Sequence, residues 1–272
     1  MRASPCPSST AERHAGINRT TADAWDRYAP HRQRVMAMIP AAGRELLVLG
    51  AGNANDIDLS ALGERFESIH LADIGGHACQ SAAEQARVET IVHELELTGL
   101  VDRLPSWKEE PPQPKVLRAI TEQASREVGK RLPGPFDVVT SAGLLSQIVL
   151  SALEVLGRDH VAFGPASVSL VVAHLRLALG LLRPGGTLVL AVDTAPRPPA
   201  FFDQLGDDAD LSKALVELEA IGQCIPATEV GFVVSVLKHL APGAAVTMAE
   251  PWVWRIGQDR SSLVYGLVCQ VS

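Results

Sequence analysis

Two pieces of the chain carry residue types that bind a nucleoside. Gly50, Ala51, Gly52 and Asn53 follow a short apolar run, and Asp73 closes a second apolar run 21 residues after Gly52. Glycines at the carboxyl end of a strand let the backbone approach a ligand closely. A carboxylate at the end of the next strand accepts hydrogen bonds from both hydroxyls of a ribose over that turn. Together they predict a nucleoside site, although a glycine turn alone is common and Asp73 alone fits a helix N-cap.

The residues after the turn discriminate between nucleoside cofactors. A dinucleotide site places a third glycine where the pyrophosphate meets a helix N-terminus. Here Asn55 stands at that place, and Asp56 and Asp58 follow. Carboxylates there repel a pyrophosphate and suit a cationic ligand, such as a sulfonium that carries a free amino group. We therefore expect S-adenosylmethionine rather than NAD.

Apolar runs that alternate with amphipathic segments must position these residues. The runs predict strands at residues 45–49, 68–72, 89–97, 136–140 and 187–192, and the segments between them predict helices at 75–87, 116–130 and 165–182. Strands alternating with helices indicate an α/β fold with a mostly parallel sheet and helices on both faces. Residues 246–256 and 262–271 predict an antiparallel C-terminal hairpin.

The remaining segments divide the chain into a tail, a helical segment and one domain. Residues 1–20 lack the apolar core of a signal peptide and predict a disordered tail. Residues 21–44 predict a helical lid segment, broken at Pro30. Residues 45–272 form the ligand-binding domain, with residues 105–114 as its most loop-like internal stretch.

In combination, the motifs resemble class I (Rossmann-like) S-adenosylmethionine-dependent methyltransferases over roughly residues 45–271. Residues 46–52 are similar to the family's first motif, 136–142 to its fourth motif and 181–186 to the turn into its fifth strand. The resemblance implies a seven-stranded sheet whose final hairpin carries the family's reversed strand. Residues 140–143 lack the Asn/Asp-Pro-Pro-aromatic and Pro-Cys sequences, which argues against the amino methyltransferases of adenine and glutamine and the carbon-5 methyltransferases of cytosine.

The resemblance also implies which residues contact the cofactor. Glu96 and Leu97 stand where the family places residues beside the adenine, and Tyr28 contacts the methionine end if its segment folds over the site. The full implied set is Tyr28, Gly50, Ala51, Gly52, Asn53, Asp73, Ile74, Glu96, Leu97, Ser141 and Ala142.

Methyl transfer requires orientation of donor and acceptor, and a base only if the acceptor must lose a proton. We take His160, in the segment after the fourth strand, and Asp193, at the carboxyl end of the fifth, as catalytic candidates. His31 is a further candidate if its segment forms a lid over the cofactor. We interpret His174 as structural, and Trp252 and Trp254, which lie on the same side of one strand, as hairpin packing.

The composition limits the partners. The 24 Lys and Arg against 31 Asp and Glu give a net charge of −7, which excludes uniform attraction to nucleic acid. The four isolated cysteines predict reduced thiols and no metal site, and we expect a cytoplasmic protein without a membrane partner. The expected activity is methylation of an O, N or S nucleophile on a small molecule. Protein or RNA methylation and a non-catalytic cofactor-binding partner subunit remain alternatives, and a homodimer remains open.

Overall fold

Seven strands form one sheet in the computed structural model, which describes residues 10–206 and 209–272. The strands are β1 (Gly43–Leu49), β2 (Phe66–Asp73), β3 (Ile91–Glu94), β4 (Phe136–Ala142), β5 (Leu182–Arg197), β6 (Ala245–Arg255) and β7 (Ser261–Gln270). Their order is β3-β2-β1-β4-β5-β7-β6. The first five run parallel, and β7 pairs antiparallel with both β5 and β6. The expected mostly parallel sheet with an antiparallel C-terminal hairpin is confirmed.

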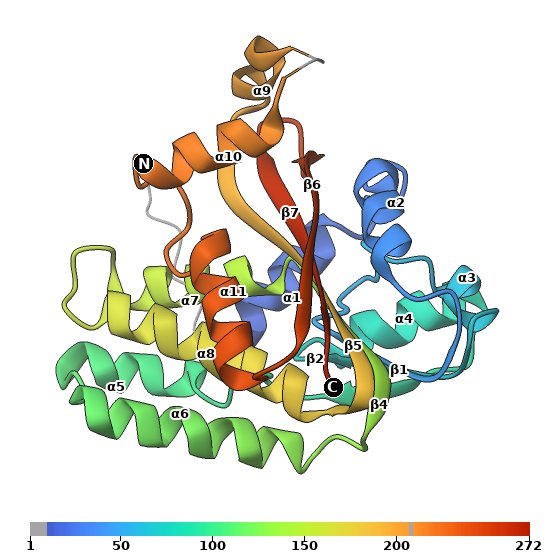
Figure 1. Cartoon of the computed structure of the whole chain (residues 1–272), viewed down its shortest axis with the longest axis horizontal. Helices are drawn as coiled ribbons and strands as arrows, with labels where there is room; N and C mark the ends of the chain where they lie inside the picture. Colours follow the sequence, from blue (N-terminus) through green and yellow to red (C-terminus); the bar gives the residue numbers. More distant parts are fainter. Residues whose placement is uncertain (1–9, 207–208) are drawn as a thin grey trace.

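Helices connect the strands and lie on both sides of the sheet (Figure 1). They are α1 (Thr10–Thr20), α2 (Ala29–Met38), α3 (Leu59–Gly63), α4 (Gly76–Ala86), the 3-10 helix η1 (Val101–Arg103), α5 (Leu104–Glu109), α6 (Pro114–Gly129), α7 (Leu144–Leu156), α8 (Phe163–Gly180), α9 (Pro199–Leu205), α10 (Leu211–Ala220) and α11 (Val230–Leu240). Within the described residues, α8 is the one helix long and apolar enough to cross a membrane, and 61% of it is buried in the fold.

Each face of the sheet has its own apolar core, which explains the continuous apolar runs of the parallel strands. Successive side chains of a strand point to opposite faces. Leu47 and Leu49 of β1 accordingly join the core formed with α6, α7 and α8. Leu46 and Val48 join the core formed with α2, α3 and α4. A strand buried on both faces needs apolar residues at every position.

β5 is longer than its parallel neighbour. Residues 182–191 pair with β4, whereas residues 192–197 pair only with β7. The register shifts between Asp193 and Ala195. Figure 1 shows β5, β7 and β6 extending beyond the other strands towards α9 and α10. These two helices and α11 make up the connection from β5 to β6.

The N-terminal region differs from expectation. The disordered tail predicted over residues 1–20 is wrong from Thr10 onwards, since Thr10–Thr20 form α1, and residues 1–9 lie outside the described residues. Pro30 does not break a helix in two, because it stands in the first turn of α2, where its missing N–H costs nothing.

Three other local expectations differ. β3 ends at Glu94 rather than at residue 97, because the following residues leave the ladder to line a cavity. The stretch 105–114, expected as a loop, contains most of α5. The helix α7 was not predicted. Its run Leu144–Leu156 is apolar except for a narrow polar stripe that includes Gln147, Ser151 and Glu154, which the sequence interpretation overlooked.

Candidate active site

The carboxyl ends of β1 and β2 bring the glycine turn and Asp73 together. Gly50 and Gly52 have φ angles of +75° and +47°, in the region that favours glycine. The Asp73 carboxylate accepts hydrogen bonds from the backbone N–H groups of Gly52 (3.2 Å) and Gly75 (2.6 Å). Burial raises the pKa of Asp73, and these two N–H groups oppose the rise. The carboxylate is therefore held in one orientation beside the turn, as the sequence predicts.

A small cavity next to Asp73 brings four of the predicted cofactor-binding residues together. It is lined by Asp73, Ile74, Leu95, Glu96, Leu97, Val101, Leu144, Ile148 and Ser151. The Glu96 carboxylate accepts hydrogen bonds from the N–H and the hydroxyl of Thr98, both at 2.8 Å, which fixes its orientation. Its mostly apolar walls with a few fixed polar groups have the chemistry of a site for a heteroaromatic ring, but its volume of about 30 Å³ means that a bound ring would have to widen it. Sequence reasoning missed Val101 and Ile148, which belong to η1 and the unpredicted α7.

Ser141 and Ala142 end β4 at the point where the strand order reverses, between β1 and β4, which is where ligands of open α/β sheets bind. The Ser141 hydroxyl lies 3.0 Å from Nε2 of His174 on α8. Burial lowers the pKa of His174 to about 4, so this ring is neutral at pH 7. Because the Ser141 hydroxyl contacts His174 on α8, Ser141 would contact a ligand through its backbone atoms. The structural interpretation of His174 agrees with this position.

Asp193 lies within β5, two residues beyond the last pair with β4, and β5 continues to Arg197 rather than ending near Asp193 as the sequence predicts. Its side chain is buried, and its carboxylate accepts a hydrogen bond from the Ser146 hydroxyl on α7. A Cβ built on Gly143 would lie 3.9 Å from Asp193 Oδ1. Burial raises the pKa of Asp193 to about 6, although Ser146 and Arg260 oppose the rise. Asp193 therefore lies close to the residue that follows β4, and its catalytic role stays a prediction.

An aromatic cluster of Tyr28, His31, Trp252 and Trp254 ties α2 to the C-terminal hairpin. The Tyr28 ring centroid lies 5.0 Å from that of Trp254, and His31 stacks on Trp254 at 4.2 Å. Trp252 Nε1 donates a hydrogen bond of 3.0 Å to His31 Nδ1. The two tryptophans do pack on the hairpin, but their partners come from α2 and the turn before it. Tyr28 and His31 thus contact Trp254, whose ring lies within 3.6 Å of the Cβ position of Gly143, the residue after β4.

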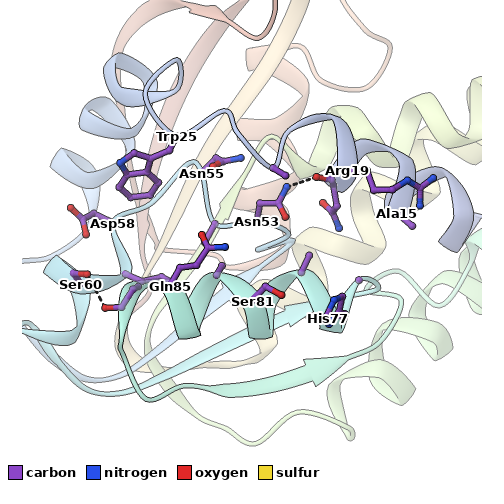
Figure 2. Close-up of a pocket in the computed structure, with 18 residues that line it drawn as sticks. Ala15, Arg19, Trp25, Asn53, Asn55, Asp58, Ser60, His77, Ser81 and Gln85 are labelled. Atoms are coloured by element: carbon purple, nitrogen blue, oxygen red, sulfur yellow. Dashed lines mark hydrogen bonds between the residues drawn. The ribbon is translucent and has the colours of Figure 1, made fainter.

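A groove of about 830 Å³ lies between α1, α4 and the loop that follows the glycine turn. Figure 2 shows Ala15 and Arg19 of α1 on one side of it and His77, Ser81 and Gln85 of α4 on the other. Asn53 and Gly75 are part of its lining, whereas Asp73, Glu96 and Asp193 are not. The groove therefore borders the predicted site without containing its carboxylates.

Helix α1 covers the glycine turn. Asn53 Nδ2 donates hydrogen bonds to the Asn18 carbonyl (2.6 Å) and to Thr21 Oγ1 (3.0 Å). The Asn18 side chain lies 2.9 Å from the position of a Cβ on Gly52 and 2.6 Å from that on Gly75. A ligand bound to Asp73 would touch or displace Asn18. Sequence reasoning missed Asn18 because no pattern in the predicted tail distinguishes this residue.

His160 lies apart from the other candidates. It belongs to the turn between α7 and α8, where its Nδ1 accepts a hydrogen bond from the Ala162 N–H at 3.2 Å. No hydrogen bond or ion pair among the described residues joins it to Asp73, Ser141 or Asp193. Over the same residues, no group of three His, Cys, Asp or Glu side chains is arranged to hold a metal ion.

Comparison with known proteins finds structural similarity alone. No family model and no curated protein sequence matches the chain. An O-methyltransferase family protein from Burkholderia thailandensis is 15% identical with a TM-score of 0.49, and the match covers 97% of this chain and 61% of that protein. The N-methyltransferase NodS from Bradyrhizobium japonicum, in complex with S-adenosyl-L-homocysteine, is 12% identical with a TM-score of 0.41, covering 99% of this chain and 93% of NodS. An S-adenosylmethionine-dependent methyltransferase from Methanosarcina mazei is 10% identical with a TM-score of 0.49, covering 86% of this chain and 95% of that protein. Because the identities are this low, the function has to be inferred from the residues of the chain itself.

Proposed function

We propose that the protein is an S-adenosylmethionine-dependent methyltransferase that acts on an O, N or S nucleophile of a small molecule. The observation that carries this proposal is the placement of the Asp73 carboxylate. It lies between a glycine turn on β1 and a cavity with apolar walls, and two backbone N–H groups fix its orientation. A ribose on Asp73 would direct an adenine into that cavity and the amino-acid end of the cofactor towards Gly50 and Gly52.

The residues present fit this cofactor. Asp73 would accept hydrogen bonds from the ribose hydroxyls, and Ile74, Leu97 and Leu144 would contact the adenine. A side chain at Gly52 or Gly75 would meet the Asn18 side chain, so the two glycines leave beside Asp73 a space that Asn18 occupies and that a ligand would take over. When bound, the cofactor supplies an electrophilic methyl group on a positively charged sulfur.

The rest of the reaction depends on orientation and on proton transfer at the acceptor. Asp193, beside Gly143 at the end of β4, would orient the acceptor by accepting a hydrogen bond from it. The raised pKa of Asp193, about 6, still leaves its carboxylate mostly ionised at pH 7 and able to accept a proton. The aromatic cluster and α1 would exclude water from this end of the site.

A small-molecule acceptor is favoured by the net charge of −7, which repels nucleic acid. Incubation with methyl-labelled cofactor and fractionated cell extract tests this point. We expect label in the small-molecule fraction. Label confined to protein or RNA would show a macromolecular acceptor, and no transfer by a chain that binds the cofactor would favour a non-catalytic partner subunit.

Calorimetric titration with S-adenosylhomocysteine and with NADH tests the cofactor. We expect binding of S-adenosylhomocysteine alone. Asp73→Asn should weaken that binding by about 10- to 100-fold, because a hydrogen bond to a charged group contributes about 1.5–3 kcal/mol. Asp159→Asn, an exposed change in the α7–α8 turn, is the matched control and should leave the affinity unchanged. Binding of NADH alone would overturn the assignment.

A further inference from the structure

A row of polar side chains crosses the sheet from β1 to β3, outside the candidate site. His70 of β2 is 5% exposed, and its two ring nitrogens face β1 and β3. Its Nδ1 lies 2.9 Å from Nε2 of His93 on β3. Its Nε2 lies 3.1 Å from Ser68 Oγ and 3.4 Å from Oε2 of Glu45 on β1. Phe136 of β4 packs edge-on against the His70 ring, and the proposed function uses none of these residues.

The two histidine rings meet edge to edge through a hydrogen bond. Their planes differ by 5°, and their centroids are 5.2 Å apart. The 2.9 Å between His70 Nδ1 and His93 Nε2 is the distance of a hydrogen bond, and it is shorter than the about 3.5–4.0 Å of stacked atoms. A zinc ion between two facing nitrogens would need about 4 Å, because each Zn–N bond is about 2.0–2.1 Å. We call this hydrogen bond the histidine link.

The neighbours determine where the ring protons lie at pH 7. Burial lowers the pKa of both His70 and His93, so both rings are neutral at this pH. The Glu45 carboxylate can only accept, which favours a proton on His70 Nε2, and the Ser68 hydroxyl can take either role. His70 Nδ1 is then the acceptor in the histidine link, and His93 Nε2 is the donor. His93 Nδ1 is left without a proton, on a side chain that is half-buried.

The histidine link tolerates one added proton but not two. The first proton binds to His93 Nδ1, so His93 Nε2–H still donates to His70, and a charged donor makes a stronger hydrogen bond. A second proton would place N–H groups on both sides of a 2.9 Å gap, where neither can accept. The charge of Glu45 opposes the effect of burial on the pKa of His70, whereas the charge of His70 adds to the effect of burial on the pKa of His93. The coupled rings therefore titrate in two steps.

The strand β3 has few other attachments to the sheet. It has four residues, lies at the edge of the sheet and pairs with β2 alone. The three residues that follow it, Leu95, Glu96 and Leu97, line the small cavity. The Leu95 N–H donates a hydrogen bond of 3.0 Å to the Asp73 carbonyl at the end of β2. A loss of the histidine link would therefore loosen β3 and one wall of the cavity together.

We propose that the histidine link is an acid-sensitive contact that holds β3 in the sheet. It persists when the pair takes up one proton, and a second proton separates the two rings and loosens residues 91–97. This device goes beyond the proposed function, and only its consequence for the cofactor rests on that function.

Nitrogen NMR of the full chain with isotope-labelled histidines tests the histidine link directly. At pH 7 we expect a nitrogen–nitrogen coupling across the hydrogen bond between His70 Nδ1 and His93 Nε2. The coupling should persist through the first protonation step and vanish with the second. No coupling at pH 7, or a coupling that persists after both rings are protonated, would overturn the proposal.

Amide hydrogen exchange, corrected for its intrinsic pH dependence, tests the loosening of residues 91–97. In an opened strand a histidine has an ordinary pKa of about 6.5, so acidification from pH 7 to pH 5 raises the opening equilibrium by at most about 25-fold for each histidine that the closed strand keeps neutral. We expect a rise of several-fold in the wild type. Glu45→Gln should enlarge the rise, because Glu45 favours protonated His70 in the closed strand. His93→Gln should reduce it, because glutamine does not titrate.

His239→Gln, the same change at an exposed position of α11, is the matched control and should show the rise of the wild type. A purely structural role of His93 would alter the opening equally at pH 7 and pH 5. The same pH dependence in His93→Gln and the wild type would therefore overturn the proposal.

Addition of S-adenosylhomocysteine separates this inference from the proposed function. Saturation with this ligand should lower the opening of residues 91–97 at pH 5, because Leu97 would contact the adenine. A chain that binds the ligand but lacks the coupling between His70 and His93 refutes this inference alone. A chain that shows the coupling and the acid-dependent exchange but binds no S-adenosylhomocysteine supports this inference and refutes the proposed function.

Discussion

Replacing Gly50 by alanine tests the packing that shapes the glycine turn. Gly50 has a φ of +75°, and a Cβ there would lie 2.9 Å from Cδ2 of Leu144, the first residue of α7. Left-handed backbone costs an alanine about 1–2 kcal/mol, and overpacking adds about 1–3 kcal/mol. We expect Gly50→Ala to lower the free energy of unfolding by about 2–5 kcal/mol and the melting temperature by about 4–10 °C.

The free energies of urea unfolding of two further variants separate the cost of backbone strain from the cost of overpacking. Gly157 has a φ of +83° with nothing within 4 Å of its Cβ position, so Gly157→Ala should show the backbone cost alone. Adding Leu144→Ala to Gly50→Ala removes both methyl groups that contact the new Cβ, so the double variant should lose less stability than the sum of the single variants. If Gly50→Ala costs no more than Gly157→Ala, or if the two changes add, the proposed contact with Leu144 is wrong.

Two other perturbations test the surroundings of the site. The pKa of His174 is about 4 in the folded protein and about 6.5 in the unfolded chain. The stability that its neutral ring contributes is therefore complete above pH 6.5 and is lost as the pH falls towards 4. The loss in the free energy of unfolding is up to about 3 kcal/mol. In urea unfolding, wild type should therefore show a steeper dependence on pH over this range than His174→Asn, and parallel profiles would contradict this assignment. Asn18→Ala removes the amide that lies against Gly52 and Gly75, so stopped-flow mixing should show faster association of S-adenosylhomocysteine. Arg19→Ala, on the exposed part of α1, should leave the rate unchanged, and equal rates for Asn18→Ala and wild type would show that α1 does not obstruct the site.

The strands could be predicted because local sequence determines them. β1, β2, β4 and β7 are largely apolar runs, and burial on both faces produces that pattern. The edge strand β6 is exposed over its first half and buried at Trp252 and Trp254. Helix α1 could not be predicted in this way. It is short and polar, and hydrogen bonds from Asn53 and Asn55 to residues 18 and 21 hold the end of this segment. Isolated helices of this length are marginal, so only tertiary contacts decide whether they form.

The candidate site likewise has residues that the sequence predicts and residues that it does not. Asp73 ends β2 and Ile74 follows it, so both could be placed from their spacing to the glycine turn after β1. The pair of Trp252 and His31 is separated by 221 residues, and no spacing rule connects a hairpin strand with an N-terminal helix. The position of His160 could not be predicted for the converse reason. Its type suggested chemistry, but its position depends on the path of two packed helices that one sequence does not reveal.

The extension of β5 beyond β4 has a consequence for how the protein could diverge. Residues 192–197 contact the sheet only through β7, and α9, α10 and α11 are all inserted between β5 and β6. The glycine turn, Asp73 and the small cavity belong to the other half of the sheet and to α7. Changes of length or sequence in residues 199–240 can therefore accumulate without altering the register of the first four strands. Related proteins could therefore differ in residues 199–240 while the half of the sheet that carries the glycine turn and Asp73 stays unchanged.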